Sequence, residues 1–277
     1  MKTSFSLCCA LLLGLLCATQ TNSSAAVTSA GSSLTALSAS GKISVTTVGT
    51  GKSIGHVADL RIHNLTGRSL RVEVPPLLLE SRTGKFQHYA CFRPQVLVIE
   101  PHGHATVRLD GVCLVHDKPP VGKGVEGELL VCDGNPATPR PEGSHFTAKD
   151  AGKLVRVAKS YDDAARILDR QGAFENMPYH NPKERQEIAT QWGVWSDRTV
   201  SHLAGGKRAA RKDLRETLTH QAEKKQPLTP EAKRKLDQGV DEIFKDVELT
   251  SKKAKAIEEP DPFAGVELTG QKAKSNT

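Results

Sequence analysis

The sequence is poor in aromatic residues and contains no hydrophobic run as long as a membrane helix. Phe, Trp and Tyr together make up 4% of the 277 residues. Because proteins that bind single-stranded nucleic acid stack bases on aromatic side chains, this scarcity argues against that class. The longest apolar run, Leu7–Ala18, has twelve residues, whereas a helix that spans a bilayer needs about 20. We therefore expect no membrane-spanning helix.

The sequence also lacks a strong charge of one sign in either half. The formal net charge is +7, of which residues 27–133 carry +2 and residues 134–277 carry +4. A mild excess that is mixed with acidic residues mainly promotes solubility. We expect no nucleic-acid partner.

Cysteine is scarce outside the apolar run. Three of the six cysteines lie within Leu7–Ala18, and Cys91, Cys113 and Cys132 remain. None of these has the C-x-x-C spacing of a zinc or redox site. In an oxidising compartment they allow at most one internal disulfide, and the sequence leaves its pairing open.

The N-terminus has the arrangement of a secretory signal peptide. Lys2 precedes the apolar run, and small polar residues follow it. This pattern predicts that residues 1–26 are removed and that the mature protein is periplasmic, on the cell surface or extracellular. Cys17, which closes the apolar run, is an alternative site for lipid attachment, although Leu16 stands where lipoproteins normally carry a small residue.

A change in composition near residue 135 predicts an α+β protein of two parts. Val, Leu, Ile, Gly and Thr are frequent up to Asp133, whereas Ala, Lys, Glu, Arg and Gln are frequent from Phe146. The expected segments are a low-complexity spacer (27–41), an Ig-like β-sandwich (42–133), a Pro-rich linker (134–146), an α-helical module (147–250) and a disordered tail (251–277).

Short runs with a period of two predict about seven antiparallel strands. Residues 58–63 and 70–74 alternate clearly, and the turn residues between them predict a β-hairpin. Further strands are expected at 42–48, 96–99, 105–109, 112–115 and 125–131. Even spacing favours an Ig-like sandwich, although the Cys, Trp, Cys pattern of antibody domains is missing.

Helical periodicity and capping residues predict the second part. Residues 148–171 repeat near 3.6, and the pairs Asn181-Pro182 and Thr229-Pro230 each combine a cap with a proline suited to the first helical position. Trp192 and Trp195 share one face of the middle helix, which is typical of a core seam. The last helix is expected to pack against it.

Five basic residues follow Gly205-Gly206 at helical spacing. They are Lys207, Arg208, Arg211, Lys212 and Arg215. One interpretation is a contact with an anion or a membrane surface. The simpler one is a solvated helix face.

The C-terminal region contains a short duplication. Residues 244–255 and 263–274 are identical at eight of twelve positions, including the string VELT. We expect the first copy to end the last helix and the second to lie in the tail, where it could bind in trans as the first packs in cis.

Residues with catalytic or ligand chemistry form only weak patterns. His88 lies three residues before Cys91, which allows a thiol nucleophile with a nearby base. His102 and His104 are too few for a metal site. Gly49–Ser53 looks like the end of a phosphate-binding loop but lacks the earlier glycine and the following helix, so it predicts a turn. We expect no cofactor.

Several strings resemble an uncharacterised group of exported bacterial proteins. The strings are Gly55–Leu60, Asn64–Thr66, Val74–Pro76, Gln87 with Tyr89, Gly111–Cys113 through Pro119-Pro120, and the Gln- and Trp-containing stretch Gln186–Trp195. The resemblance implies a small β-sandwich followed by a helical region in the bacterial envelope. It implies no activity.

The sequence thus favours a non-enzymatic binding or structural protein of the bacterial cell envelope. Its β-sandwich would use loops or edge strands to bind a protein or glycan partner. One alternative is an envelope thiol enzyme or hydrolase that uses Cys91 and His88, or Cys113. Another is an adaptor that contacts anionic lipid or polysaccharide through the basic helix.

Overall fold

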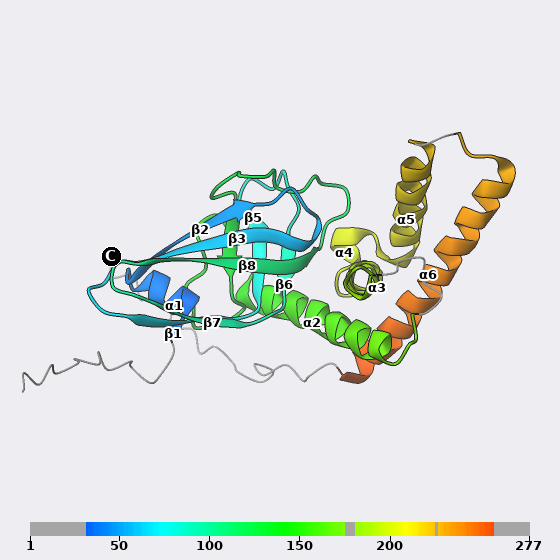
Figure 1. The fold of residues 1–277 in the computed structure, drawn as a ribbon. Coiled ribbons are helices and arrows are strands. Elements are labelled where there is room, and N and C mark those ends of the chain that lie inside the picture. The colour runs from blue at the N-terminus through cyan, green and yellow to red at the C-terminus, as the bar shows by residue number, and fades with distance from the viewer. Residues whose placement is uncertain (1–31, 175–180, 225–226, 258–277) are drawn as a thin grey trace, which may run out of the picture.

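A computed structural model describes residues 32–174, 181–224 and 227–257. The protein is mixed α+β, with mostly antiparallel strands in the first part and helices in the second (Figure 1). The predicted signal peptide, Cys17 and the second copy of the duplication lie outside the described residues.

Two sheets make up the strand module. Six strands form one sheet in the order β2-β3-β8-β6-β5-β9, and three form the other in the order β1-β4-β7. The strands are β1 (Ser32–Ser33), β2 (Ile43–Gly49), β3 (Ile54–Asn64), β4 (Leu70–Val74), β5 (Leu77–Ser81), β6 (Tyr89–Cys91), β7 (Gln95–Ile99), β8 (His104–Cys113) and β9 (Leu129–Cys132).

The six-stranded sheet nearly closes on itself. Gly49 N donates to Val125 O at 2.9 Å, and Gly127 N donates to Thr47 O at the same distance. Thr47 Oγ1 also donates to Leu129 O at 2.8 Å. These bonds bring the β9 end of the sheet back to β2. The module is therefore barrel-like and not clearly the Ig-like sandwich that strand spacing suggested.

The predicted hairpin of residues 58–63 and 70–74 is wrong. Strand β3 pairs with β2 and β8, whereas β4 pairs with β7 in the other sheet. Asn64 explains the separation, because its Nδ2 donates to the carbonyl oxygens of Arg68, Ile99 and Glu100. These bonds hold the turn that leads the chain from one sheet to the other.

Strands β5 and β6 have no counterpart in the expected set. Every residue of both strands is buried. One reason is that helix α2 (Ala148–Arg170) packs against them. Because neither face meets solvent, the alternation that reveals a half-buried strand is missing.

The end of the predicted low-complexity spacer is folded. Ser33 Oγ accepts from Ala36 N at 3.2 Å and caps helix α1 (Leu34–Ala39). Leu34 and Leu37 are buried, and α1 contacts β2 and β4. Two leucines at helical spacing therefore anchor this segment to the strand module.

The predicted helix starts are confirmed. Asn181 Oδ1 accepts from Lys183 N at 2.9 Å at the start of α3 (Pro182–Ser196). Thr229 Oγ1 accepts from Ala232 N at 3.2 Å at the start of α6 (Pro230–Ile257). Helix α6 includes residues 251–257, where Ala254 is buried, so this part of the predicted disordered tail is helical.

The remaining helices form an arm. Helices α4 (Ser201–Ala204) and α5 (Gly206–Glu223) follow α3. Helix α5 leads away from the strand module, and α6 returns antiparallel to α5 and ends beside α2 (Figure 1). Helix α6 packs against α3, as predicted. Trp192 and Trp195 are buried edge-to-face at 4.9 Å, which confirms the core seam.

Candidate functional site

The outer face of β2, β3 and β8 carries polar side chains in two rows across the strands. Side chains of directly opposed residues point to the same face of a sheet. The register places Ser44, His63 and His104 in one row and Thr46, Arg61 and Thr106 in the next.

These rows line an open groove of about 290 Å³, which Glu126 also borders. The rings of His63 and His104 stack with centroids 4.0 Å apart. Arg61 forms an ion pair with Glu126. The groove therefore offers hydrogen-bond donors and acceptors while its one cation and one anion balance each other.

The strands that form the groove bury their opposite face in the core. Leu60, Ile62 and Val107 lie in the same strands and are buried on the opposite face. Hydroxyl, imidazole, guanidinium and carboxylate groups held in this way match a neutral ligand with many hydroxyl groups. The sequence pattern around His102 and His104 does not reveal this row, because Ser44 and His63 lie far from His104 along the chain.

The three described cysteines form no disulfide. Cys91, Cys113 and Cys132 are each free and buried. Burial raises the pKa of the Cys91 and Cys113 thiols well above the ordinary range, and that of Cys132 to about 11. All three are therefore protonated near neutral pH, and a thiol is a much weaker nucleophile than a thiolate.

The His88 ring is held by a backbone hydrogen bond and an aromatic neighbour. Its Nδ1 accepts from Ser81 N at 3.0 Å, and its ring lies edge-on to Phe146. Burial lowers the pKa of His88 to about 4, so the ring is neutral near pH 7. No hydrogen bond joins His88 to Cys91 in the described structure. The geometry does not support the predicted pairing of nucleophile and base.

Most basic residues of the predicted anion contact form ion pairs within the protein. Lys207 pairs with Glu248, Arg211 with Asp241, and Arg215 with Asp237, and each pair joins α5 to α6. Lys212 pairs with Glu216 at 3.6 Å within α5. Of the five basic residues, Arg208 alone has no ionic partner among the described residues. This face of α5 is a ladder of ion pairs to α6. The basic pattern alone could not predict it, because the partner carboxylates of α6 lie far away along the chain.

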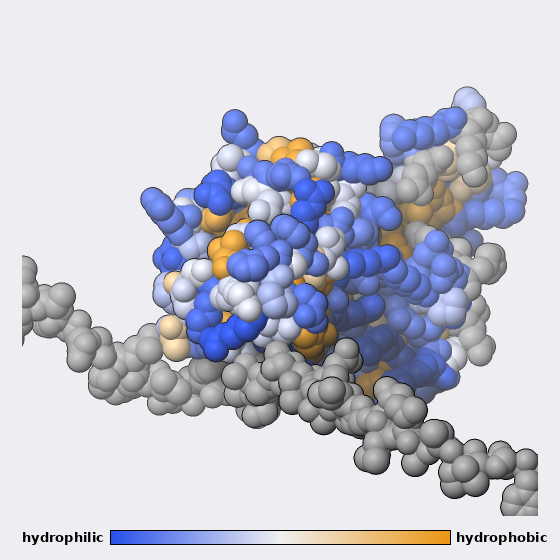
Figure 2. All heavy atoms as spheres, turned by 60° about the vertical axis from the view of Figure 1, so that its left-hand side comes forward, coloured by the Kyte–Doolittle hydropathy of each residue, from blue (hydrophilic) through white to orange (hydrophobic). Residues whose placement is uncertain are grey.

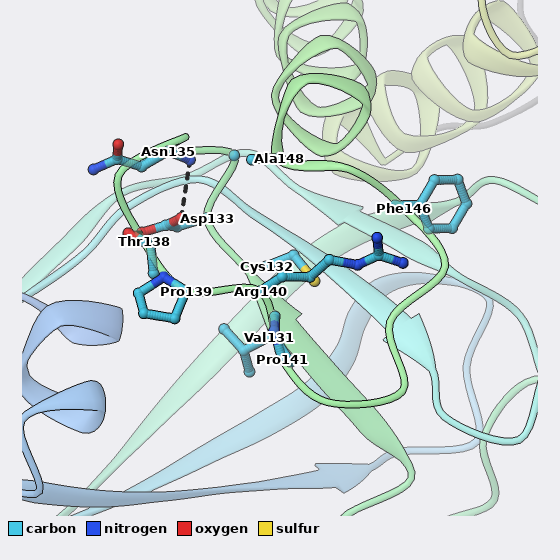
Figure 3. A pocket seen from close by; sticks show the side chains of 11 residues that line it. Val131, Cys132, Asp133, Asn135, Thr138, Pro139, Arg140, Pro141, Phe146 and Ala148 are labelled. Carbon is cyan, nitrogen blue, oxygen red and sulfur yellow. Dashed lines mark hydrogen bonds between the residues drawn. The ribbon is translucent and has the colours of Figure 1, made fainter. Parts of the chain in front are cut away.

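The Pro-rich segment 134–146 folds across the end of β9 and encloses a small pocket. Figure 3 shows the Arg140 side chain running past Cys132 toward Phe146. The cavity of about 20 Å³ has room for about one water molecule. Behind it, Ser144 Oγ and His145 N donate to the buried Glu80 carboxylate at 2.5 and 2.6 Å. These contacts fasten the segment to β5.

A second exposed feature is the edge strand β7. Strand β7 ends the order β1-β4-β7, so it has one paired neighbour among the described strands. Val96 and Val98 point outward and are 52% and 51% exposed. Figure 2 shows one face of the protein, on which apolar atoms of the strand module lie in separate patches among polar ones. An open edge with exposed valines is suited to pairing with another strand.

Residues 32–174, 181–224 and 227–257 contain no group of three His, Cys, Asp or Glu side chains arranged for a metal ion. None of the helices described there combines the length and apolar character that crossing a membrane requires.

Comparison of the chain with protein-family models, curated proteins and solved structures finds no match. The site must therefore be interpreted from its own geometry.

Proposed function

We propose that this protein is a non-enzymatic binding protein of the bacterial cell envelope whose barrel-like module holds a neutral glycan on β2, β3 and β8. The observation that carries the proposal is the pair of polar rows across these strands. Export rests on the signal-peptide pattern of residues 1–26.

The balanced charge and the open shape of the groove favour a neutral glycan over a strongly anionic ligand. Its only described charges, Arg61 and Glu126, neutralise each other, which disfavours a strongly anionic ligand. An open groove also admits a polymer that continues beyond both ends. The thiol-enzyme alternative has less support because the described thiols are buried and protonated. The anionic-surface adaptor has less support because most of its cations are paired.

Calorimetric titration with a panel of soluble neutral oligosaccharides tests this function. Arg61→Ala and His104→Ala should each weaken binding about tenfold, which corresponds to about 1.4 kcal/mol. Arg71→Ala is the matched control, because Arg71 lies on the outer side of β4 and pairs with Glu73 at 3.9 Å. Unchanged affinity in the groove variants, or no binding to any neutral glycan, would contradict the proposal.

A second candidate function is the binding of an extended protein segment by β7. The exposed valines on an open edge favour it. The double variant Val96→Lys and Val98→Lys should prevent photocross-linking of a partner from a photoreactive residue at the exposed position 100, which follows β7, and leave glycan binding unchanged. Cross-linking that persists in this variant would exclude the edge as the contact.

A further inference from the structure

The duplicated C-terminal segment keeps the residues that the structure buries. Its first copy, residues 244–255, forms part of α6. The buried residues of this copy are Phe244, Val247, Thr250 and Ala254, none more than 2% exposed. The second copy has the same residue types at the matching positions, which are Phe263, Val266, Thr269 and Ala273.

The differences between the copies fall at positions of α6 that are not buried. The four positions that differ are Lys245, Asp246, Ser251 and Lys252, and none of them is buried. Glu248, which pairs with Lys207, recurs as Glu267. The duplication therefore preserves the buried residues of the first copy, while residues at partly or fully exposed positions vary, among them Ser251 beside Tyr161.

The surface that receives the first copy belongs to three helices. Helix α6 packs against α2, α3 and α5. Tyr161 on α2 shares a hydrogen bond of 2.9 Å with Ser251, and the Arg211 guanidinium on α5 lies over the Phe244 ring at 5.9 Å. This acceptor surface recognises a helix with the pattern F-x-x-V-x-x-T-x-x-x-A.

We propose that residues 263–274 of the same chain are a second occupant of this acceptor surface and can replace residues 244–255. Five residues separate Ile257 from Phe263, so the second copy has a high effective concentration at its own surface. Asp261 and Pro262 supply residue types that favour a helix start just before Phe263. The length of the loop 244–262 is no obstacle to the exchange, because loop-closure entropy grows slowly with length.

The sequence also explains why the first copy is the resident one. The second copy has Gly265 and Gly270 where the first has Asp246 and Ser251. Glycine disfavours a helix interior, and Gly270 cannot form the hydrogen bond that Ser251 makes with Tyr161. The second copy is thus the weaker occupant and takes over when the first is weakened or held by another molecule.

Aspartate substitutions in the full chain test this exchange. Val266→Asp alone should leave stability unchanged, because the first copy is resident. In a Val247→Asp background, adding Val266→Asp should lower the ratio of folded to unfolded helical module about tenfold more, as measured by hydrogen exchange. Adding Leu268→Asp instead should have little effect, because its counterpart Leu249 is 40% exposed. Equal exchange rates with and without Val266→Asp would overturn the proposal.

Cross-linking provides a readout that does not depend on stability. In a Val247→Asp chain with serine at positions 8, 9 and 17, Lys207→Cys and Glu267→Cys should be joined by a bismaleimide within one chain. The pair Lys207→Cys and Glu248→Cys in the Val247 background shows that the linker spans this contact. A link between two chains would make a second molecule the occupant and overturn the proposal, as would the absence of any link.

Discussion

The side-chain amide of Gln191 pairs with the backbone of Cys113 through both of its polar atoms. Nε2 donates to Cys113 O at 2.8 Å, and Oε1 accepts from Cys113 N at 3.0 Å. Trp195 Nε1 donates to the same carbonyl at 2.8 Å. All three residues are buried. The end of β8 is therefore joined to α3 by a polar contact that water does not reach.

Substitutions of Gln191 should loosen this joint. Gln191→Ala should lower the free energy of unfolding by about 1–2 kcal/mol, because two buried hydrogen bonds are lost. Gln191→Glu should cost about 3 kcal/mol or more, because a carboxylate oxygen would face the Cys113 carbonyl without a donor. Urea unfolding measures both. Gln238→Ala, on the exposed side of α6, is the control and should change stability by less than about 0.5 kcal/mol; an equal effect there would contradict a specific joint.

Charge reversal should distinguish the ion-pair ladder from an anion-binding surface. Arg211→Glu should destabilise the protein by about 1 kcal/mol, because Arg211 pairs with Asp241 and lies over Phe244. Arg208→Glu should change stability by less than about 0.5 kcal/mol. Neither variant should alter the binding of anionic vesicles in a sedimentation assay. Salt-sensitive vesicle binding that Arg208→Glu abolishes would instead favour the membrane adaptor.

His88 should make the protein sensitive to acid. Because the pKa of His88 is about 4 in the folded protein, against an ordinary value of 6.5, the unfolded state binds a proton first as the pH falls. Stability from this residue is complete above about pH 6.5 and declines toward pH 4, by about 3 kcal/mol at most.

The variant His88→Asn tests this dependence. An asparagine oxygen can still accept from Ser81 N but does not titrate. Between pH 4 and 6.5, the free energy of unfolding of His88→Asn should therefore change less with pH than that of the wild type, as measured by denaturation curves at each pH. His202→Asn, at an exposed position on α4, is the control. An unchanged slope in His88→Asn would show that other groups cause the acid sensitivity.

The three described cysteines should be unreactive until the protein unfolds. A chain with serine at positions 8, 9 and 17 should react slowly with a thiol-specific disulfide reagent at pH 7.5, because Cys91, Cys113 and Cys132 are buried and protonated. In denaturant all three should react rapidly. Fast reaction of one thiol in the native protein would reopen the thiol-enzyme alternative.

The sequence by itself determined the elements whose signals are local. Asn181 with Pro182 and Thr229 with Pro230 start helices through bonds to residues two or three positions away. The alternation in β3, β4 and β8 was visible because one face of these strands is more exposed than the other. The order of strands before helices, and hence the α+β class, follows from the same local patterns.

Only the tertiary structure decided what long-range pairing controls. Strand β3 pairs with β8, and the near-closure of the sheet depends on bonds between residues such as Thr47 and Leu129 that no period reveals. The same is true of the candidate site, because His63 and His104 share a row only in the observed register. Local patterns specify which residues form a strand or a helix, whereas the partner of each element is chosen by packing and hydrogen bonding between segments that are distant in the chain.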